Sequence, residues 1–449
     1  MDIRKSFFLL SLIFLIFLGS IFLFPIFSYQ EARRVVIIQE AFLNHSLIPT
    51  FNGEPYFTKP PLYTWLGLIF FSFGKIFGLE VAFLRIFSIL CYLLTAYLLY
   101  LILKKDLKRT LLTLFILFSS FRFLSFIYRI DLEPLFIFFT TLSFYFLIKF
   151  IENPSSMKAF YFYFCFALAF LVRGPLHFFL LPALLFYGIF FKEKKFFKLL
   201  FYLPGWLFLL FVILPWYLYG YLKYGGSIFQ EFFYIDIWKR IYEKTDPFYY
   251  YFEVSFLNFF PSFILISIKF KNFIKFMKTS TNPEIKLYFI SFLIPLILLS
   301  FTGEKFDKYL LFLYPFLSLF LSEVLLNLYS KTFLFRFFAF LMMINFFAIL
   351  GIQFSQFEEV KFKTKFLAEN LPKHEKYSFY MEVNPYILYL LQKPVPVIKS
   401  EKDLSKILEQ GYFILSPFKI KNFIPKAVYP DPYKKNKIWY LYRLPLSPK

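Results

Sequence analysis

Residues 30–65 read QEARRVVIIQEAFLNHSLIPTFNGEPYFTKPPLYTW and follow directly on an apolar run at residues 6–28. The stretch carries charges and amides in a chain that is otherwise mostly hydrocarbon. Polar groups kept against a membrane are costly and usually serve a function. The stretch therefore ends the first membrane-spanning segment and marks the first place to look for a site.

The composition around this stretch defines the class of protein. The chain has 449 residues, of which 59% are hydrophobic and 26% aromatic, with 76 Phe, as is typical of a polytopic membrane protein. The net charge of +22 sits mainly in short loops, where Lys and Arg set topology or meet membrane lipids, so we do not expect nucleic acid as a partner. Cys91 and Cys165 lie inside apolar runs, which supports neither a disulfide framework nor a thiolate metal site.

Apolar runs long enough to cross a bilayer, at about 20 residues each, predict an all-α polytopic fold with about 11 to 13 transmembrane helices. The eleven clearest runs are residues 6–28, 82–103, 110–128, 132–150, 159–172, 174–191, 199–219, 251–268, 286–301, 309–328 and 332–352. If Arg4 and Lys5 stay in the cytoplasm, alternation places every basic cluster there too, including the loop KFKNFIKFMK at 269–278. We therefore expect a cytoplasmic N-terminus in the cytoplasmic (inner) membrane.

Two polar segments then fall on the outer face, residues 29–81 and 220–250. In the first, residues 31–43 mix apolar and charged positions, as does a helix lying in the interface, and residues 61–77 are expected to be re-entrant or interfacial. After residue 352 the composition changes, and the strand-like runs YSFYM, PVPVI and YFILSP alternate with helical stretches such as 361–370 and 401–409. This predicts a transmembrane domain at 1–352 and a small extracytoplasmic α/β domain at 353–449.

Ionisable residues from five loops collect on the predicted outer face: Glu31, Arg33, Arg34, Glu54, Lys59, Arg122, Arg129, Asp131, Arg173, Asp236, Lys239, Arg240, Glu304, Lys305 and Lys308. Many cations beside a few carboxylates suit displacement of a phosphate-linked leaving group from a lipid carrier. Asp131 is the most informative, because it sits at the mouth of an apolar span, where a carboxylate needs a partner or a function. A structural ion pair and headgroup anchoring are the alternatives.

Seven motifs follow one another along residues 1–350: EARR with NGEPYFTKPPLYTW, RIDLEP at 129–134, LVRGP at 171–175, LPWY at 214–217, FYIDIWKR at 233–240, DPFYYY at 246–251 and EKFDKYLLFLYP at 304–315. Their order resembles the bacterial aminoarabinose transferase and protein mannosyltransferase superfamily. These are polytopic glycosyltransferases of the C type, with the GT-C fold, that use polyprenyl-phosphate sugars. The resemblance implies such a fold and such a donor.

The resemblance also implies roles for particular residues. Those expected to hold the donor phosphate are Lys59, Arg173, Arg240, Lys305 and Tyr309. The catalytic carboxylates at the reacting centre are expected to be those of Glu31 and Asp131. Further residues of the site loops are expected to be Gln30, Arg34, Tyr56, Asp236 and Lys308. Gly174, after Arg173, is alternatively the mark of a close helix crossing.

Three positions depart from the family pattern. The family's first loop begins with an Asp-Glu pair where this chain has Gln30 and Glu31, and Thr58 and Ile237 replace an acid and a histidine of the aminoarabinose branch. The chain has only 3 His, so we expect no histidine-supported metal site and no resident cofactor, although a divalent cation held by carboxylates stays open.

The function expected is transfer of a sugar from a polyprenyl-phosphate donor to a lipid A-type or other envelope glycolipid. This lipopolysaccharide-modifying reaction is expected on the outer face of the cytoplasmic membrane. Gln30 favours a lipid or glycan acceptor, because an anionic phosphate needs no base whereas a protein hydroxyl does. The alternatives are a protein O-mannosyltransferase-like enzyme, a transporter of lipid-linked sugars and an inactive scaffold.

Overall fold

The computed structural model describes residues 8, 11–13, 15, 16, 18, 19, 21–242, 246–372, 375–421, 423–434 and 436–443, with backbone alone at 235, 236, 240, 402 and 405. By packing, the chain forms two compact units. Unit 1 comprises Met1–Gly19, Phe57–Tyr63 and Arg85–Ile349. Unit 2 comprises Ser20–Tyr56, Thr64–Leu84 and Leu350–Lys449. The predicted boundary at 352/353 concerns membrane topology, so it stays a prediction.

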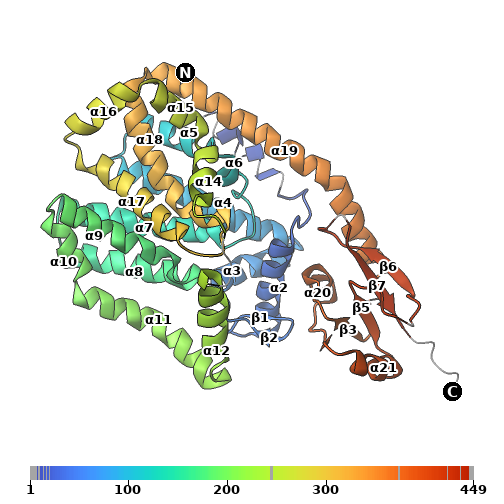
Figure 1. The fold of residues 1–449 in the computed structure, drawn as a ribbon. Coiled ribbons are helices and arrows are strands. Elements are labelled where there is room, and N and C mark those ends of the chain that lie inside the picture. The colour runs from blue at the N-terminus through green and yellow to red at the C-terminus, as the bar shows by residue number, and fades with distance from the viewer. Residues whose placement is uncertain are drawn as a thin grey trace. The chain divides into compact units, whose positions relative to one another are not determined.

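Unit 1 is helical (Figure 1). Its elements, some of which begin or end in unit 2, are α4 (Glu80–Ile102), α5 (Leu107–Phe118), α6 (Phe121–Leu124), α7 (Glu133–Glu152), α8 (Ser156–Arg173), η1 (Pro175–Phe179), α9 (Leu180–Phe190), α10 (Lys194–Leu200), α11 (Leu203–Tyr224), α12 (Ser227–Phe229), η2 (Gln230–Trp238), α13 (Lys239–Tyr242), α14 (Tyr250–Asn258), α15 (Phe260–Ile268), α16 (Phe270–Thr279), α17 (Pro283–Ser300), η3 (Asp307–Leu313), α18 (Tyr314–Leu328) and α19 (Lys331–Asn370). The helices α7, α8 and α11 pack side by side.

Among the described residues, seven helical segments are long and apolar enough to cross a membrane. They are Glu80–Ile102, Glu133–Glu152, Ser156–Arg173, Lys194–Tyr224, Pro283–Ser300, Asp307–Leu328 and Lys331–Asn370. An eighth arises if α14 and α15, bent by 81°, form one broken span. The class of polytopic helical membrane protein is thus confirmed, whereas the number of 11 to 13 spans stays a prediction.

Two predicted spans differ in detail from the structure. The run 110–128 is interrupted, because α5 ends at Phe118 and the Ser120 hydroxyl accepts the backbone N–H of Phe123 to begin α6. The run 251–268 bends at Phe259, just before Pro261 in the first turn of α15. Ser120 satisfies a backbone N–H at the first break, and Pro261 has no backbone N–H to satisfy at the second. Each residue therefore lets a helix break inside an apolar run.

The polar stretch after the first apolar run folds as α2 (Tyr29–Asn44), a hairpin of β1 (Thr50–Phe51) and β2 (Glu54–Pro55), and α3 (Leu62–Phe77). The predicted helix at 31–43 is confirmed, but its apolar side chains Val35, Val36 and Ile38 are buried in protein, at 0–2% exposure. Helix α2 packs against α20 within unit 2. Because these three side chains are buried in protein, they do not form the lipid-facing side that an interfacial helix would present. Residues 62–77 form one uninterrupted helix, and their membrane position stays a prediction.

The C-terminal part of unit 2 is an α/β fold, as predicted. Its elements are β3 (Tyr377–Tyr380), α20 (Pro385–Leu391), β4 (Val397–Ile398), α21 (Glu401–Glu409), β5 (Phe413–Ser416), β6 (Ala427–Pro430) and β7 (Ile438–Tyr442). The sheet order is β4-β3-β5-β7-β6, with β4, β3 and β5 parallel and β7 antiparallel to both of its neighbours. The predicted helical stretch at 361–370 is helical in the structure, where it forms the last part of the 40-residue helix α19.

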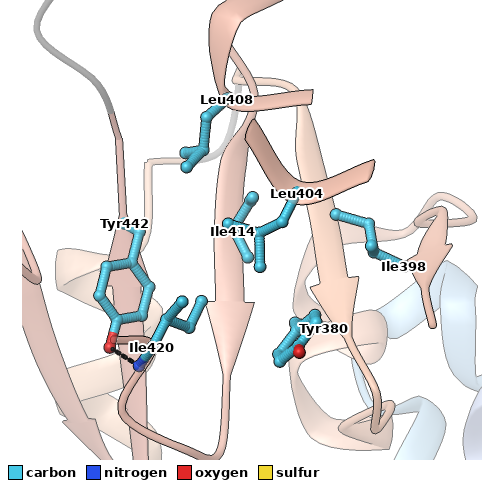
Figure 2. Close-up of a cluster of buried hydrophobic side chains, with 7 residues drawn as sticks. All are labelled: Tyr380, Ile398, Leu404, Leu408, Ile414, Ile420 and Tyr442. Atoms are coloured by element: carbon cyan, nitrogen blue, oxygen red, sulfur yellow. Dashed lines mark hydrogen bonds between the residues drawn. The ribbon is translucent and has the colours of Figure 1, made fainter. Parts of the chain in front are cut away.

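One face of this sheet carries an apolar core under α21 (Figure 2). Leu404 and Leu408 lie one turn apart on α21 and pack with Ile414 of β5, all at 0–1% exposure. The hydroxyl of Tyr442 accepts the backbone N–H of Ile420 at 2.9 Å, which closes the edge of the cluster. This core holds the sheet together independently of the helices of unit 1.

Candidate functional site

A cavity of about 560 Å³ in unit 1 brings several predicted site residues together. Its polar lining consists of Lys59, Arg173, Thr302, Glu304 and Tyr309. Its apolar lining consists of Pro175, Leu176, Phe178, Phe179, Pro182, Ile237, Ile241, Leu298 and Leu299. Two cations beside extended apolar walls suit a ligand with a phosphate and a hydrocarbon chain.

Arg173 is placed by the way α8 ends. Gly174 follows it with φ +79° and ψ −152°, a conformation open essentially to glycine, and Pro175 then starts η1. A Cβ at Gly174 would lie 3.1 Å from the ring of Phe232, so the chain also passes close to η2 here. The motif LVRGP therefore terminates α8 and leaves Arg173 at the cavity.

The guanidinium of Arg173 is buried among partners that fix its orientation. It lies 4.6 Å from the ring centroid of Tyr309, and its Nη1 donates to Oε1 of Glu133. The side chains of Arg173 and Glu133 are 4% and 1% exposed. A buried cation with a carboxylate and an aromatic ring is held rigidly, and much of its charge is already balanced.

A second ion pair joins this one. Lys308 Nζ lies 3.1 Å from Oδ2 of Asp131 and 3.4 Å from Oε1 of Glu133. Asp131 also accepts the N–H of Leu132 at Oδ1. The two carboxylates and two cations of this cluster, Asp131, Glu133, Arg173 and Lys308, carry formal charges that cancel. Asp131 thus has the partner that its position in an apolar setting requires.

The loop before η3 is fastened by Lys305. Its ammonium donates to the carbonyl oxygens of Asp246 and Thr302, and its backbone N–H donates to Oδ2 of Asp246 at 2.8 Å. Burial holds the pKa of Lys305 below its ordinary value, opposed by the carboxylate of Asp246. Lys305 thus binds loop carbonyls behind Thr302, which lines the cavity, and its role at a phosphate stays a prediction.

The start of η3 is held from the opposite side by Arg122. Its Nη2 donates to Oδ1 of Asp307 at 2.7 Å and its Nε lies 2.7 Å from Oδ2. Asp307 Oδ1 also accepts the N–H of Lys308. This two-point pair fixes the segment that presents Lys308 and Tyr309.

The predicted residues at the start of α2 lie in unit 2 and contact one another locally. Ser28 Oγ accepts the N–H of Glu31 at 3.2 Å, and Glu31 Oε2 accepts the N–H of Phe27 at 2.9 Å. This closely resembles a capping box, so Glu31 has a structural task at the helix N-terminus. Gln30 is exposed and accepts from Arg33.

Arg34 and Tyr56, also predicted in the site loops, contact each other. Arg34 Nη1 donates to the Tyr56 hydroxyl at 3.3 Å, and the guanidiniums of Arg33 and Arg34 lie 5.9 and 5.8 Å from the Tyr56 ring centroid. Tyr433 of the C-terminal segment lies near Glu31. Burial, together with the neighbouring Tyr386 and Glu31, raises the pKa of the Tyr433 hydroxyl well above its ordinary value.

The hairpin of the same loop depends on a residue that the sequence did not single out. The carboxylate of Glu40 accepts from Thr50 Oγ1 at 2.6 Å and from the N–H groups of Asn52 and Gly53 at 2.7 and 3.0 Å. Asn52 and Gly53 have φ +58° and +78°, as an Asn-Gly turn requires. The NGE motif is therefore explained by hairpin geometry.

Three acidic residues near the cavity were not predicted as site residues, namely Glu133, Asp246 and Glu304. All three stand inside motifs, RIDLEP, DPFYYY and EKFDKYLLFLYP, so their signal was the motif that contains each of them. The predicted Asp236 and Arg240 have side chains outside the described residues. Within the described ranges, no three His, Cys, Asp or Glu side chains are placed to hold a metal ion.

The backbone that precedes Arg240 is unusual. Residues 230–238 form a π-helix, η2, which presents Ile237 to the cavity and continues into α13, where Ile241 does the same. Wide helical turns of this kind are rare and occur often at functional sites. The FYIDIWKR motif thus contributes lining to the cavity even where its charged side chains are not described.

Comparison with known proteins supports the resemblance. Residues 58–219 match the family model described as dolichyl-phosphate-mannose-protein mannosyltransferase. An uncharacterized protein of Aquifex aeolicus (strain VF5) is 32% identical over 219 residues, which is 47% of this chain and 43% of that protein. Another from the same organism is 27% identical over 403 residues, or 87% of this chain and 89% of that protein.

Two solved structures share the fold. ArnT from Cupriavidus metallidurans bound to undecaprenyl phosphate superposes with a TM-score of 0.82 over 100% of both chains at 12% identity. The same protein in the apo state gives 0.79 over 98% of both chains at 13% identity. The chain therefore has the fold of ArnT, and over residues 58–219 it is similar to the protein mannosyltransferase family.

Proposed function

We propose that the protein is a membrane glycosyltransferase that takes a sugar from a polyprenyl-phosphate donor. The observation that carries this proposal is the 560 Å³ cavity, where Lys59, Arg173 and Tyr309 meet apolar walls. A polyprenyl phosphate has matching chemistry, an anion on a long hydrocarbon chain. The shared fold with ArnT, crystallised with undecaprenyl phosphate, supports the same assignment.

Lys59 and Arg173 have different tasks in this proposal. The charge of Arg173 is largely balanced by Glu133, so Arg173 and Tyr309 shape and orient the phosphate pocket. Lys59 lines the cavity as a point charge and stabilises the phosphate as the leaving group gains charge. Lys308 keeps Asp131 and Glu133 in place, and Arg240 and Lys305 complete the predicted phosphate ligands.

Two carboxylates are candidates for orienting the attacking group. Asp131 was predicted from the sequence and is paired with Lys308, whereas Glu304 lines the cavity. The capping contacts of Glu31 favour a structural role for that residue, and Gln30 has no carboxylate to act as a base. For a carboxylate that acts on the acceptor, Asp131 and Glu304 are therefore the two candidates of this proposal.

The acceptor follows from the same reasoning. An anionic acceptor, such as the phosphate of a lipid A-type glycolipid, needs no base, and this suits a first loop that begins with Gln30. A protein O-mannosyltransferase-like activity is the second candidate, because the matching family model is that of a protein mannosyltransferase. In either case we place the site on the outer face of the cytoplasmic membrane, with the C-terminal α/β domain on the same side.

The test is sugar transfer by the full-length protein in nanodiscs, from a panel of polyprenyl-phosphate sugars to lipid A or to a serine- and threonine-rich peptide. We expect product with lipid A. Asp131→Asn and Glu304→Gln then test the need for a base: with lipid A both variants should keep kcat near the wild-type value, whereas loss of a general base, as a hydroxyl acceptor would require, lowers kcat by about 10²- to 10⁴-fold. Product on the peptide alone would overturn the lipid acceptor, and absence of product with every donor would overturn the proposed transfer.

A further inference from the structure

The basic stretch predicted as a cytoplasmic loop at 269–278 is largely the helix α16, Phe270–Thr279. At about 100° per residue, its lysines Lys271, Lys275 and Lys278 fall on one arc. Five apolar side chains fall on the other side of the helix, with Ile274 at its edge: Phe270, Phe273, Ile274, Phe276 and Met277. The helix contains no Asp or Glu, so its polar face is uniformly cationic.

The apolar arc of α16 is only partly covered by the described part of the protein, because Phe273, Phe276 and Met277 are half-buried while the edge with Phe270 and Ile274 is exposed. None of the helix residues is buried, and Phe270 and Ile274 are 57% and 36% exposed. In water such a stripe would be unfavourable. An amphipathic helix of this pattern is stable where its apolar arc enters hydrocarbon and its lysines remain among headgroups.

The place of α16 in the chain brings it to a membrane boundary. It connects the apolar helices α15 and α17, and α17 is one of the candidate membrane spans (Figure 1). Its first end is fixed by Lys269, whose Nζ donates to the carbonyl of Leu328 and lies 4.2 Å from the ring centroid of Tyr329. Lys269 therefore ties the helix to the end of α18, whereas none of the three lysines of the arc forms an ion pair with another described residue.

We propose that α16 is an in-plane membrane anchor that binds anionic lipid headgroups. The three lysines contact lipid phosphates, and the Phe, Ile and Met side chains enter the boundary of the acyl chains. A bilayer surface fits better than an acidic protein, because the neighbouring helices α15 and α17 are apolar. If they lie in the membrane, the bilayer surface is directly beside α16. This proposal is independent of the sugar-transfer activity.

The experiment uses full-length protein, one copy per nanodisc, with an environment-sensitive fluorophore at Ile274→Cys. The native Cys91 and Cys165 are buried, so labelling is confined to the new thiol. In phosphatidylglycerol discs we expect blue-shifted emission and protection from iodide. The shift should weaken in phosphatidylcholine discs and in high salt. A probe at Thr279→Cys, on the polar arc, should stay quenched.

Neutralisation tests the lysines directly. Lys271→Gln, Lys275→Gln and Lys278→Gln together should weaken the preference for anionic over zwitterionic discs by about 100-fold, at roughly a fivefold contribution from each lysine. The matched control neutralises three exposed lysines elsewhere, at Lys192, Lys194 and Lys198, and should leave the probe unchanged. Single Lys→Gln variants give the same trend in smaller steps if the triple variant folds poorly.

Three results would overturn the proposal. The first is a probe at residue 274 as exposed to iodide as that at residue 279 in phosphatidylglycerol discs. The second is equal protection in both lipids that is indifferent to salt. The third is the same blue shift in phosphatidylcholine discs on adding inorganic phosphate, which would identify a site for a free anion.

Discussion

The two groups of motif charges differ in where their partners come from. Around the cavity of unit 1, Arg173 of α8 meets Glu133 of α7 and, through it, Lys308 of η3, all distant in sequence. At the start of α2 in unit 2, Glu31 and Gln30 form hydrogen bonds within four residues, although Glu31 also lies near Tyr433. Long-range pairing at a cavity indicates a site, whereas local pairing at a helix end indicates capping. The polar stretch at 30–65 contributes to both regions, because Glu31 lies at the start of α2 and Lys59 lines the cavity.

The largest effect that sharpens this comparison is expected at Arg173. Arg173→Leu leaves the 1%-exposed Glu133 without its main partner, which should lower the free energy of unfolding by about 3–5 kcal/mol. Thermal unfolding in nanodiscs measures the loss. Arg173→Leu with Glu133→Leu should regain most of the stability but not the binding of polyprenyl phosphate. Equal stability of the single variant and the wild type would contradict the buried pair.

A smaller effect is expected at the hairpin of unit 2. Glu40→Gln removes a charged acceptor of three hydrogen bonds and should cost about 1.5–3 kcal/mol. Hydrogen exchange at the amides of Asn52 and Gly53 should accelerate, while binding of polyprenyl phosphate stays unchanged. Glu54→Gln, an exposed position on the same hairpin, is the control. Unchanged exchange at these amides would show that Glu40 does not hold the turn.

The smallest effect is expected at Glu31. Glu31→Gln weakens the cap and its favourable charge at the helix N-terminus, which should cost about 0.5–1 kcal/mol. Sugar transfer should remain near the wild-type rate. A decrease of about 10²-fold or more, with the fold intact, would instead return Glu31 to the reacting centre and remove the contrast between the two regions.

Much of the architecture could be read from the sequence because its signals are local. Apolar runs and basic loops indicate a polytopic protein, and LVRGP encodes the end of α8, since Gly174 alone permits the turn that follows Arg173. The strands β3, β4 and β5 and the helix α21 were likewise expected, from three strand-like runs and a helical stretch after the change of composition. The break at Pro261 had a local signal too, but an apolar run conceals it.

What could not be read depends on tertiary packing. Glu133 stands two residues from Asp131, yet its partner Arg173 lies 40 residues away, and spacing does not reveal such a pair. The burial of Val35 and Ile38 required knowledge that α20 packs on α2, because the same pattern describes a lipid-facing helix. Lys305 and Lys59 look alike in the sequence, but one binds loop carbonyls and the other lines the cavity.

The most direct test of the central claim is the affinity of the full-length protein for polyprenyl phosphate, measured with wild type, Lys59→Gln and the exposed control Lys223→Gln. Loss of one charged contact to phosphate, worth about 1.5–3 kcal/mol, predicts binding about 10- to 100-fold weaker for Lys59→Gln. The control should bind like the wild type, and all three should unfold at the same temperature. Binding by Lys59→Gln that equals the wild type would contradict a phosphate site in this cavity.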